Sequence, residues 1–245
     1  MLSEFEKLNE KKRLSALPTL QQPRTVRLKF HKVGKLQYIS HLDLQRTFMR
    51  VIVRACIPAW YTKGFNPHAK LVFSTPLSVG SESEYEFLDI RIDKDMSPNE
   101  IMDRLNAELT DELRITDAYI PKTDFSEIAY ATYDIRIFTE GADKNTAEDI
   151  KKAMTEAPLM LTKKTKAGEK EIDIVPLIKS ADVGFADGVV FILATLSASV
   201  GEFLNPELLI TGLKTKCGIL SGDESKEWYT ILRTSVRKKD LTLFT

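Results

Sequence analysis

The side chains of this sequence best suited to acid–base chemistry near neutral pH are its three histidines, and two of them, His41 and His68, lie in a strongly basic stretch between Gly34 and Gly80. An imidazole has an ordinary pKa of about 6.5, so it can accept and return a proton near neutral pH. Either histidine could take the 2′-hydroxyl proton of RNA while a neighbouring arginine or lysine stabilises the charged phosphorane. One hypothesis is therefore a metal-independent ribonuclease with His41 and His68 as its catalytic residues.

Positive charge is concentrated between residues 24 and 80. This stretch holds ten Lys and Arg against one acid, Asp43, which gives a net charge of +9. The whole chain has 35 basic and 35 acidic residues, so the remainder carries −9. Segregated charge of this kind favours an anionic partner for the basic part. The predicted phosphate contacts are Arg27, Lys29, Lys35, Arg46, Arg50, Arg54, Lys63 and Lys70.

Aromatic side chains accompany these charges. Tyr38, Trp60, Tyr61 and Phe65 are available to stack on splayed bases, which is how proteins commonly recognise single-stranded RNA. We include Tyr38 and Phe65 in the predicted nucleic-acid site. RNA binding, with RNA as the partner, is the leading hypothesis.

No spacing in the sequence favours a metal or another cofactor. A site built from His41, His68 and either Asp43 or Cys56 lacks the paired-ligand spacings of common zinc sites, so we rank it last. Cys56 and Cys217 are far apart without a C-x-x-C pair, and two structural thiols are expected. No apolar run is long enough to span a membrane and the N-terminus lacks the apolar stretch of a signal peptide, so we expect a cytoplasmic protein without membrane contact.

The elements that must position these side chains can be predicted from periodicity. Residues 26–32 alternate apolar and basic side chains, which predicts a half-buried strand with a positive outer face. Ser40 followed by Asp43 matches a capping box, so a helix is expected from His41 to about Cys56. Arginines recur at every fourth position of this helix and should share one face, where acidic neighbours are scarce. The plainer alternatives are that Asp43 is only a cap and that the arginine face is only solvated.

The order of predicted elements indicates the fold class. Residues 24–122 read as strand, helix, strand, strand, helix, strand, and residues 129–237 repeat that order, with residues 159–168 and 170–183 as two of the strands. This order predicts an α+β protein of two tandem ferredoxin-like domains, each an antiparallel sheet with two helices on one face. Residues 1–23 are expected to form a tail or a helix, separated from the fold by two prolines. Tandem folds of this kind also resemble the RAMP-like repeat-processing ribonucleases of CRISPR systems, which is an analogy of fold alone.

Seven short stretches carry more specific motifs. They are residues 36–44 (LQYISHLDL), 50–58, 64–68 (GFNPH), 76–80 (PLSVG), 85–90 (YEFLDI), 171–178 (EIDIVPLI) and 205–208 (NPEL). Together they resemble the radical SAM-linked protein family, a group of unknown function found alone or fused behind a radical S-adenosylmethionine domain. The resemblance implies a non-catalytic adaptor that binds a radical SAM protein partner. The chain lacks the cluster-binding cysteine triplet of radical SAM enzymes, and the family usually has a small polar residue where His31 stands.

We further predict that the two catalytic candidates converge. A helix beginning at His41 offers main-chain N–H groups that favour an anion, and the GFNPH loop could present His68 beside it. The predicted cleft would include Lys35, Arg46 and Lys63. In a ferredoxin-like order these two segments belong to opposite ends of the first helix, so convergence requires the loop to fold back along the sheet.

Overall fold

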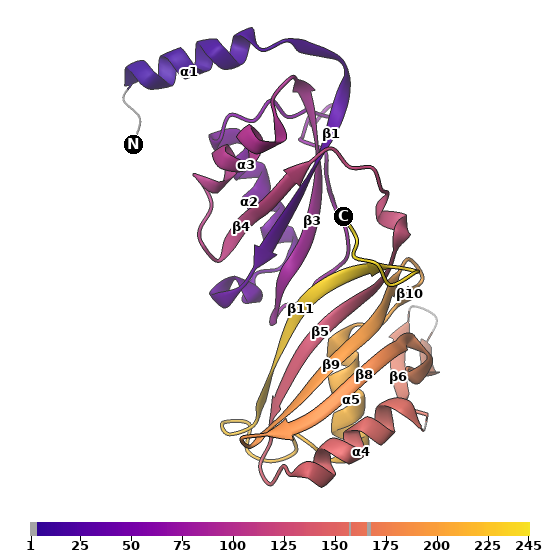
Figure 1. The fold of residues 1–245 in the computed structure, drawn as a ribbon. Helices are drawn as coiled ribbons and strands as arrows, with labels where there is room; N and C mark the ends of the chain where they lie inside the picture. Colours follow the sequence, from indigo (N-terminus) through magenta and orange to yellow (C-terminus); the bar gives the residue numbers. More distant parts are fainter. Residues whose placement is uncertain (1–3, 157, 166–167) are drawn as a thin grey trace. The chain divides into compact units, whose positions relative to one another are not determined.

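The computed structural model describes residues 4–156, 158–165 and 168–245. Within this part, the protein is of mixed α+β class, with five α-helices and strands that pair mostly antiparallel. The chain divides into two compact units, which we describe separately (Figure 1). Unit 1 comprises Met1–Val79 and Glu86–Lys122, and unit 2 comprises Gly80–Tyr85 and Thr123–Thr245.

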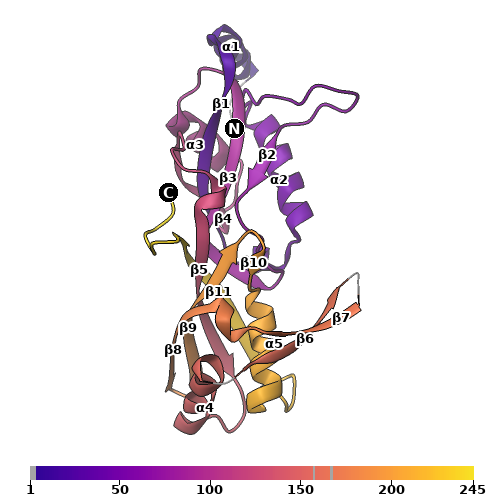
Figure 2. The same cartoon turned by 90° about the vertical axis from the view of Figure 1, so that its right-hand side faces the viewer.

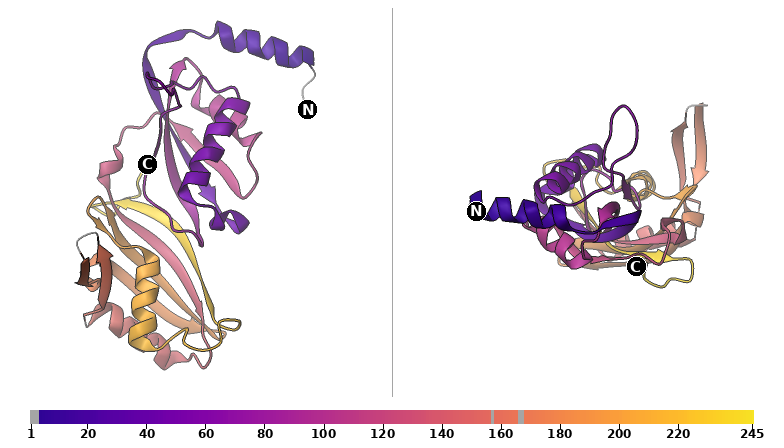
Figure 3. Two further views of the ribbon diagram at one scale, coloured as in Figure 1. Left: turned by 180° about the vertical axis from the view of Figure 1, so that it is seen from behind. Right: turned by 90° about the horizontal axis from the view of Figure 1, so that it is seen from above.

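Unit 1 has helix α1 (Glu4–Ala16) followed by a sheet with two helices on one face (Figures 1 and 3). The strand order is β2 (Leu71–Phe73), β3 (Ser81–Lys94), β1 (Thr19–Lys32) and β4 (Leu113–Tyr119). Helices α2 (His41–Arg54) and α3 (Pro98–Asn106) pack their apolar residues into one cluster with the sheet. A short 3₁₀ helix, η1 (Gly34–Tyr38), joins β1 to α2.

The predicted burial of the alternating apolar side chains of β1 is confirmed. Val26, Leu28 and Phe30 are fully buried. The ring of Phe30 meets that of Phe48 on α2 edge-on, with centroids 5.1 Å apart, and Phe73 of β2 lies 6.4 Å from Phe30. This aromatic cluster fixes which face of α2 turns inward.

Helix α2 begins at His41, as predicted, because Ser40 caps it. The Ser40 hydroxyl accepts the Asp43 N–H at 3.2 Å and donates to the Asp43 carboxylate at 2.7 Å. Half of the predicted capping box is therefore present: the Asp43 carboxylate bonds the cap hydroxyl, whereas in a complete box it would bond the cap N–H. The helix ends at Arg54, two residues before the expected end, and Cys56 follows with a left-handed φ of 53°.

Strand β1 begins earlier than the alternation indicated. It starts at Thr19 and includes Pro23, which was expected to separate the N-terminal segment from the fold. The described pairing of β1 with β4 starts only at Arg27. Pro23 therefore lies outside this pairing, where a residue without a backbone N–H can be accommodated. The extension lies beside the end of β3, where the Asp95 N–H donates to the carbonyl of Pro18.

Unit 2 repeats the element order of unit 1. Its strand order is β8 (Ile178–Ala186), β9 (Val189–Ser199), β5 (Ile128–Phe138) and β11 (Trp228–Lys238), with β10 (Glu202–Phe203) also on β9. Strand β11 pairs in parallel with Ser81–Ser83 of β3, the part of that strand in unit 2. Helices α4 (Lys144–Thr155) and α5 (Pro206–Cys217) lie on one face of this sheet (Figure 1).

The strand predicted over residues 170–183 is wrong as a single element. Its first part belongs to β7 (Gly168–Asp173), which pairs with β6 (Met160–Thr165) as a separate two-stranded ribbon (Figure 2). A 3₁₀ turn, η3 (Val175–Leu177), then precedes β8. Pro176 explains the break, because proline has no N–H to donate to a strand ladder.

Candidate functional site

The strongest candidate site lies on α2, whose apolar stripe decides where its charges point. Leu44, Phe48, Val51 and Ile52 are buried against the sheet. Arg46, Arg50 and Arg54 consequently lie on the exposed side, and we call these three residues the basic helix face.

Each arginine of the basic helix face has a different neighbour. Arg46 donates to Asp43 at 3.1 Å, and Arg54 donates to Glu108 at 2.8 Å. Arg50 has no hydrogen-bond or ion-pair partner within residues 4–156, 158–165 and 168–245. The Ser40 hydroxyl and then Arg46 lower the pKa of Asp43, so that carboxylate stays charged. Because both ion pairs are exposed and screened by water, the basic helix face remains open to a stronger anion.

The basic side chains of β1 do not join this face. Arg27 is buried at 1% exposure and holds Asp89 of β3 through two hydrogen bonds of 2.7 and 2.9 Å. Its guanidinium therefore cannot meet a phosphate in this structure, and we remove Arg27 from the predicted site. Lys29 and His31 alternate with the core residues of β1, so they lie on the face of the sheet opposite α2.

Those two residues have local roles. Burial lowers the pKa of Lys29, and the nearby Asp117 carboxylate opposes that shift. The Nε2 atom of His31 lies 2.7 Å from the carbonyl oxygen of Asp111, which can only accept, so Nε2 carries the proton. The single positive surface predicted from strand and helix together is thus divided between two faces of the sheet.

The segment between β1 and α2 adds one cation and one aromatic ring. Lys35 is exposed, and Tyr38 is 68% exposed. The neighbouring Lys32 is buried instead, and its Nζ donates to the carbonyls of Leu36 and Gln37 at 3.2 Å. Lys32 therefore fixes η1 in place.

The GFNPH loop forms a narrow projection that we call the finger, residues 61–69 (Figure 2). A bridge between Tyr61 and Ala69 closes its base, and the Thr62 N–H donates to the carbonyl of His68 at 2.9 Å. The His68 Nδ1 atom lies 3.0 Å from the carbonyl of Asn66, so this ring helps to shape the turn. The side chain of Phe65 is fully exposed.

Lysines lie within and next to the finger, and the aromatic side chains near its base differ in their exposure. Lys63 and Lys70 are both exposed, and Tyr61 is 43% exposed. Trp60 is half-buried beneath Arg91, whose guanidinium carbon lies 5.3 Å from the ring centroid. Sequence inspection could not have found this contact, because the two residues are distant in the chain.

The strand register argues against the predicted convergence of His41 and His68. The ring of His41 packs edge-on against Phe73, with centroids 4.9 Å apart. His68 precedes Phe73 by five residues of extended chain, which corresponds to about 16 Å at roughly 3.3 Å per residue. Phe73 pairs with Leu88 of β3. Ala59, next to the base of the finger, instead bridges to Ile92, which lies four residues further along β3. This register argues against a phosphodiester shared by the two imidazoles.

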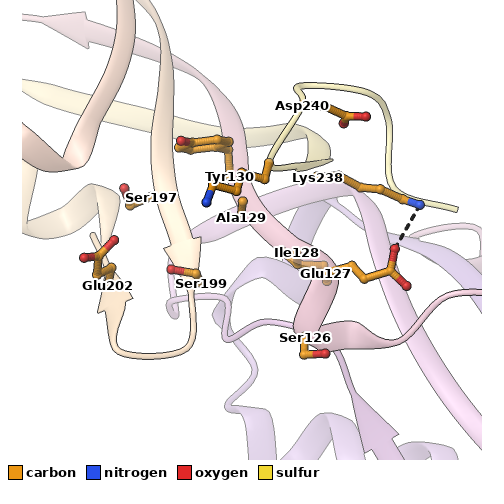
Figure 4. A pocket seen from close by; sticks show the side chains of 11 residues that line it. Ser126, Glu127, Ile128, Ala129, Tyr130, Ser197, Ser199, Glu202, Lys238 and Asp240 are labelled. Carbon is orange, nitrogen blue, oxygen red and sulfur yellow. Dashed lines mark ion pairs between the residues drawn. The ribbon is translucent and has the colours of Figure 1, made fainter.

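Unit 2 contains a hollow of about 630 Å³ between β5, β9 and the end of β11 (Figure 4). Its wall holds two lysines, Lys238 and Lys239, and Lys238 is engaged by Glu127 at 3.1 Å. A backbone N–H of Asp124 and then Lys238 lower the pKa of Glu127, which keeps the pair charged. With Glu202 and Asp240 also in its wall, this hollow has no excess of positive charge and does not extend the anion site.

The part of the chain that the structure describes has neither a metal-binding cluster nor a membrane-spanning helix. It contains no group of three or more His, Cys, Asp or Glu side chains placed to hold a metal ion. It also contains no helix long and apolar enough to cross a membrane.

The sequence matches a known protein family. A family model described as "Uncharacterized protein conserved in bacteria (DUF2344)" matches residues 25–206. No curated protein matches the chain.

Proposed function

The chain belongs to this family of uncharacterized bacterial proteins, and we propose that it binds single-stranded RNA through the basic helix face and the finger. The observation that carries the proposal is the exposed arginine stripe of α2, in which Arg50 has no partner among the described residues. Flexible RNA could bring successive phosphates to guanidinium groups one helical turn apart.

The finger supplies the second kind of contact. Phe65 offers an exposed ring for a splayed base, while Lys63 and Lys70 beside it suit the adjoining phosphates. Stacking of a base on an aromatic side chain contributes about 1–3 kcal/mol and tolerates any base. The proposed site therefore favours single strands and has little base selectivity.

The fold we propose for both units is ferredoxin-like. The order β2-β3-β1-β4 in unit 1 and β8-β9-β5-β11 in unit 2 supports this assignment, since both place the first and third strands at the centre. Many folds of this type bind RNA, but that is an analogy, and the argument for RNA rests on the side chains.

We also propose a setting for the protein. Its motifs resemble radical SAM-linked proteins, so an RNA-bound copy would act in the cytoplasm as an adaptor that presents RNA to a radical SAM partner. This arrangement needs no catalytic group in the chain itself. Cleavage by His41 or His68 would have to proceed from one imidazole alone, because the register separates them.

The test is the affinity for a fluorescently labelled oligouridylate, measured by anisotropy for the wild type and for Arg50→Gln. Loss of one charged contact should cost about 1 kcal/mol, which is roughly fivefold in Kd. Arg114→Gln is the matched control, because Arg114 is an exposed arginine of β4 that belongs neither to the basic helix face nor to the finger. Equal losses in both variants, or none in Arg50→Gln, would contradict the proposal. The same samples, run on a gel after incubation with EDTA, report whether the RNA is cut.

A further inference from the structure

The sheet of unit 2 has one face without a helix in the part of the chain that the structure describes. Helices α4 and α5 lie on the other face (Figures 1 and 3). On β9 the buried residues alternate with Phe191 and Leu193, which are 41% and 50% exposed on the uncovered face. At one end of this face Phe138 and Trp228 stack with centroids 4.5 Å apart. The face thus exposes several large apolar side chains to water.

The ring of Phe191 lies over Gly184 of the neighbouring strand. Phe191 pairs with Gly184 on β8, and a Cβ atom at Gly184 would lie only 2.1 Å from the Phe191 Cζ atom. The ring therefore occupies the space that any larger residue at position 184 would fill. Because the side chain of Phe191 is 41% exposed, the rest of its surface can contact another apolar group.

Carboxylates surround this apolar strip. Asp134 and Asp182 flank Leu193 from the two neighbouring strands, and Asp187 lies in the turn beyond. Asp134 has an ion pair with Arg136 at 3.4 Å, but Asp182 and Asp187 have no such partner among the described residues. These carboxylates, together with Arg136, Phe191 and Leu193, line a depression of about 590 Å³. We call this surface the acidic face; its charge disfavours RNA and favours a cationic partner with an apolar tip.

The chain itself carries a segment with that chemistry. The tip of the finger is the fully exposed Phe65, and Lys63 and Lys70 flank it. We propose that the finger of one copy docks on the acidic face of unit 2 in a second copy. Phe65 would lie against Phe191 and Leu193, and the two lysines would face the free carboxylates.

The charge distribution of the whole chain supports this pairing. Residues 24–80 carry +9 and the remainder −9, so each copy holds both halves of a complementary pair. The depression is within the range of roughly 300–1,000 Å³ typical of binding clefts, so it can accept one aromatic side chain. This proposal does not depend on RNA binding, although a finger occupied by RNA could not dock.

Two different surfaces are involved, so the contact is heterologous. Each copy that donates its finger leaves its own acidic face available, and association can continue from copy to copy or close into a ring. A contact made by one finger is small, and small interfaces are weak and depend on concentration. The wild-type protein should therefore show a mass that rises with concentration beyond that of a dimer.

The experiment measures mass by sedimentation equilibrium on full-length protein freed of nucleic acid. Phe65→Ser removes the tip of the finger, and Leu193→Lys places a cation on the acidic face. Each variant alone should be monomeric across the concentrations at which the wild type associates. Val200→Lys is the control, since Val200 is an exposed apolar residue of unit 2 in the turn after β9 and should leave association unchanged. Circular dichroism establishes that all variants are folded.

Mixing the two variants gives the decisive result. Phe65→Ser retains an intact acidic face and Leu193→Lys retains an intact finger, so the mixture has one working contact. We expect heterodimers and nothing larger. A wild type that stays monomeric at every concentration would overturn the proposal, as would association of either variant alone to the wild-type extent. A mixture that remains monomeric while the wild type associates would also overturn it.

Discussion

At the scale of single residues, burial divides the basic side chains into two groups with different roles. Arg27 and Lys32 lie inside unit 1, where they hold Asp89 and the carbonyls of η1. Arg50, Lys63 and Lys70 lie on the surface and carry the proposed binding. Mutations of the first group should therefore change stability, and mutations of the second group should change affinity.

Arg27→Ala tests the structural group. It leaves the partly buried Asp89 carboxylate without its guanidinium partner, and breaking such a pair costs about 3 kcal/mol. Urea denaturation should show that loss for Arg27→Ala, whereas Arg50→Ala should stay within about 0.5 kcal/mol of the wild type because it is exposed. Similar stabilities for the two variants would show that the buried pair has no structural importance.

Tyr229 offers a residue-scale prediction that depends on pH. Burial, the hydrogen bond to Glu207 at 2.6 Å and the charge of Glu207 raise the pKa of Tyr229 to about 12. A raised pKa means that the neutral phenol contributes stability below its ordinary pKa of about 10, and that this contribution is lost as the pH rises toward 12. Ultraviolet titration should give a lower tyrosine pKa in Glu207→Gln, and an unchanged curve would contradict this assignment.

At the scale of elements, local signals predicted α2 well and the strand ends poorly. Ser40 caps the helix and a 3.6-residue periodicity buries one face, and both effects depend on neighbours within a few residues. The start of β1 at Thr19 depends instead on β3, far along the chain, and no local pattern encodes that.

The candidate site shows the same limit. The sequence identified the exposed arginines of α2, because helical periodicity is local, but it placed Arg27 on the same surface. The Arg27–Asp89 pair joins residues 62 positions apart, so only the sheet register reveals it. The predicted convergence of His41 and His68 depends on register in the same way, because the finger precedes β2 whereas His41 contacts Phe73 at the end of β2.

Ser40→Ala tests the cap of α2. Loss of the hydroxyl leaves the Asp43 N–H without its acceptor, and caps of this kind contribute about 1 kcal/mol. Thermal unfolding should show that loss of stability, and Ser40→Asp should restore it because an aspartate can cap the same N–H group. A fully stable Ser40→Ala would contradict the role of the cap in fixing the basic helix face.

Phe65→Ser tests the finger as a binding element. Phe65 is fully exposed, so the free energy of unfolding should stay within about 0.5 kcal/mol of the wild type. Removing one stacking ring should weaken oligouridylate binding by about 1–3 kcal/mol. Anisotropy titrations provide the measurement, and unchanged affinity would exclude the finger from the RNA site.

At the scale of the whole molecule, the chain has no net charge but contains two oppositely charged parts. Its net charge of zero would not suggest a nucleic-acid-binding protein, but the +9 carried by residues 24–80 does. Folding neutralises part of that excess through Asp89, Asp95 and Glu108, and the cations that stay exposed cluster on α2 and around the finger. RNA binding is therefore expected to involve a few phosphates and to be sensitive to salt.

The salt dependence of RNA affinity tests this central claim most directly. For single strands, the slope of log K against log salt concentration falls by about 0.7 for each phosphate contacted. Replacing Arg46, Arg50 and Arg54 together by Gln should make the slope shallower by about 2, because three contacts are removed. We expect a steep slope for the wild type and a shallower one for this folded triple variant; equal slopes, or a wild-type affinity independent of salt, would show that these arginines do not contact RNA phosphates.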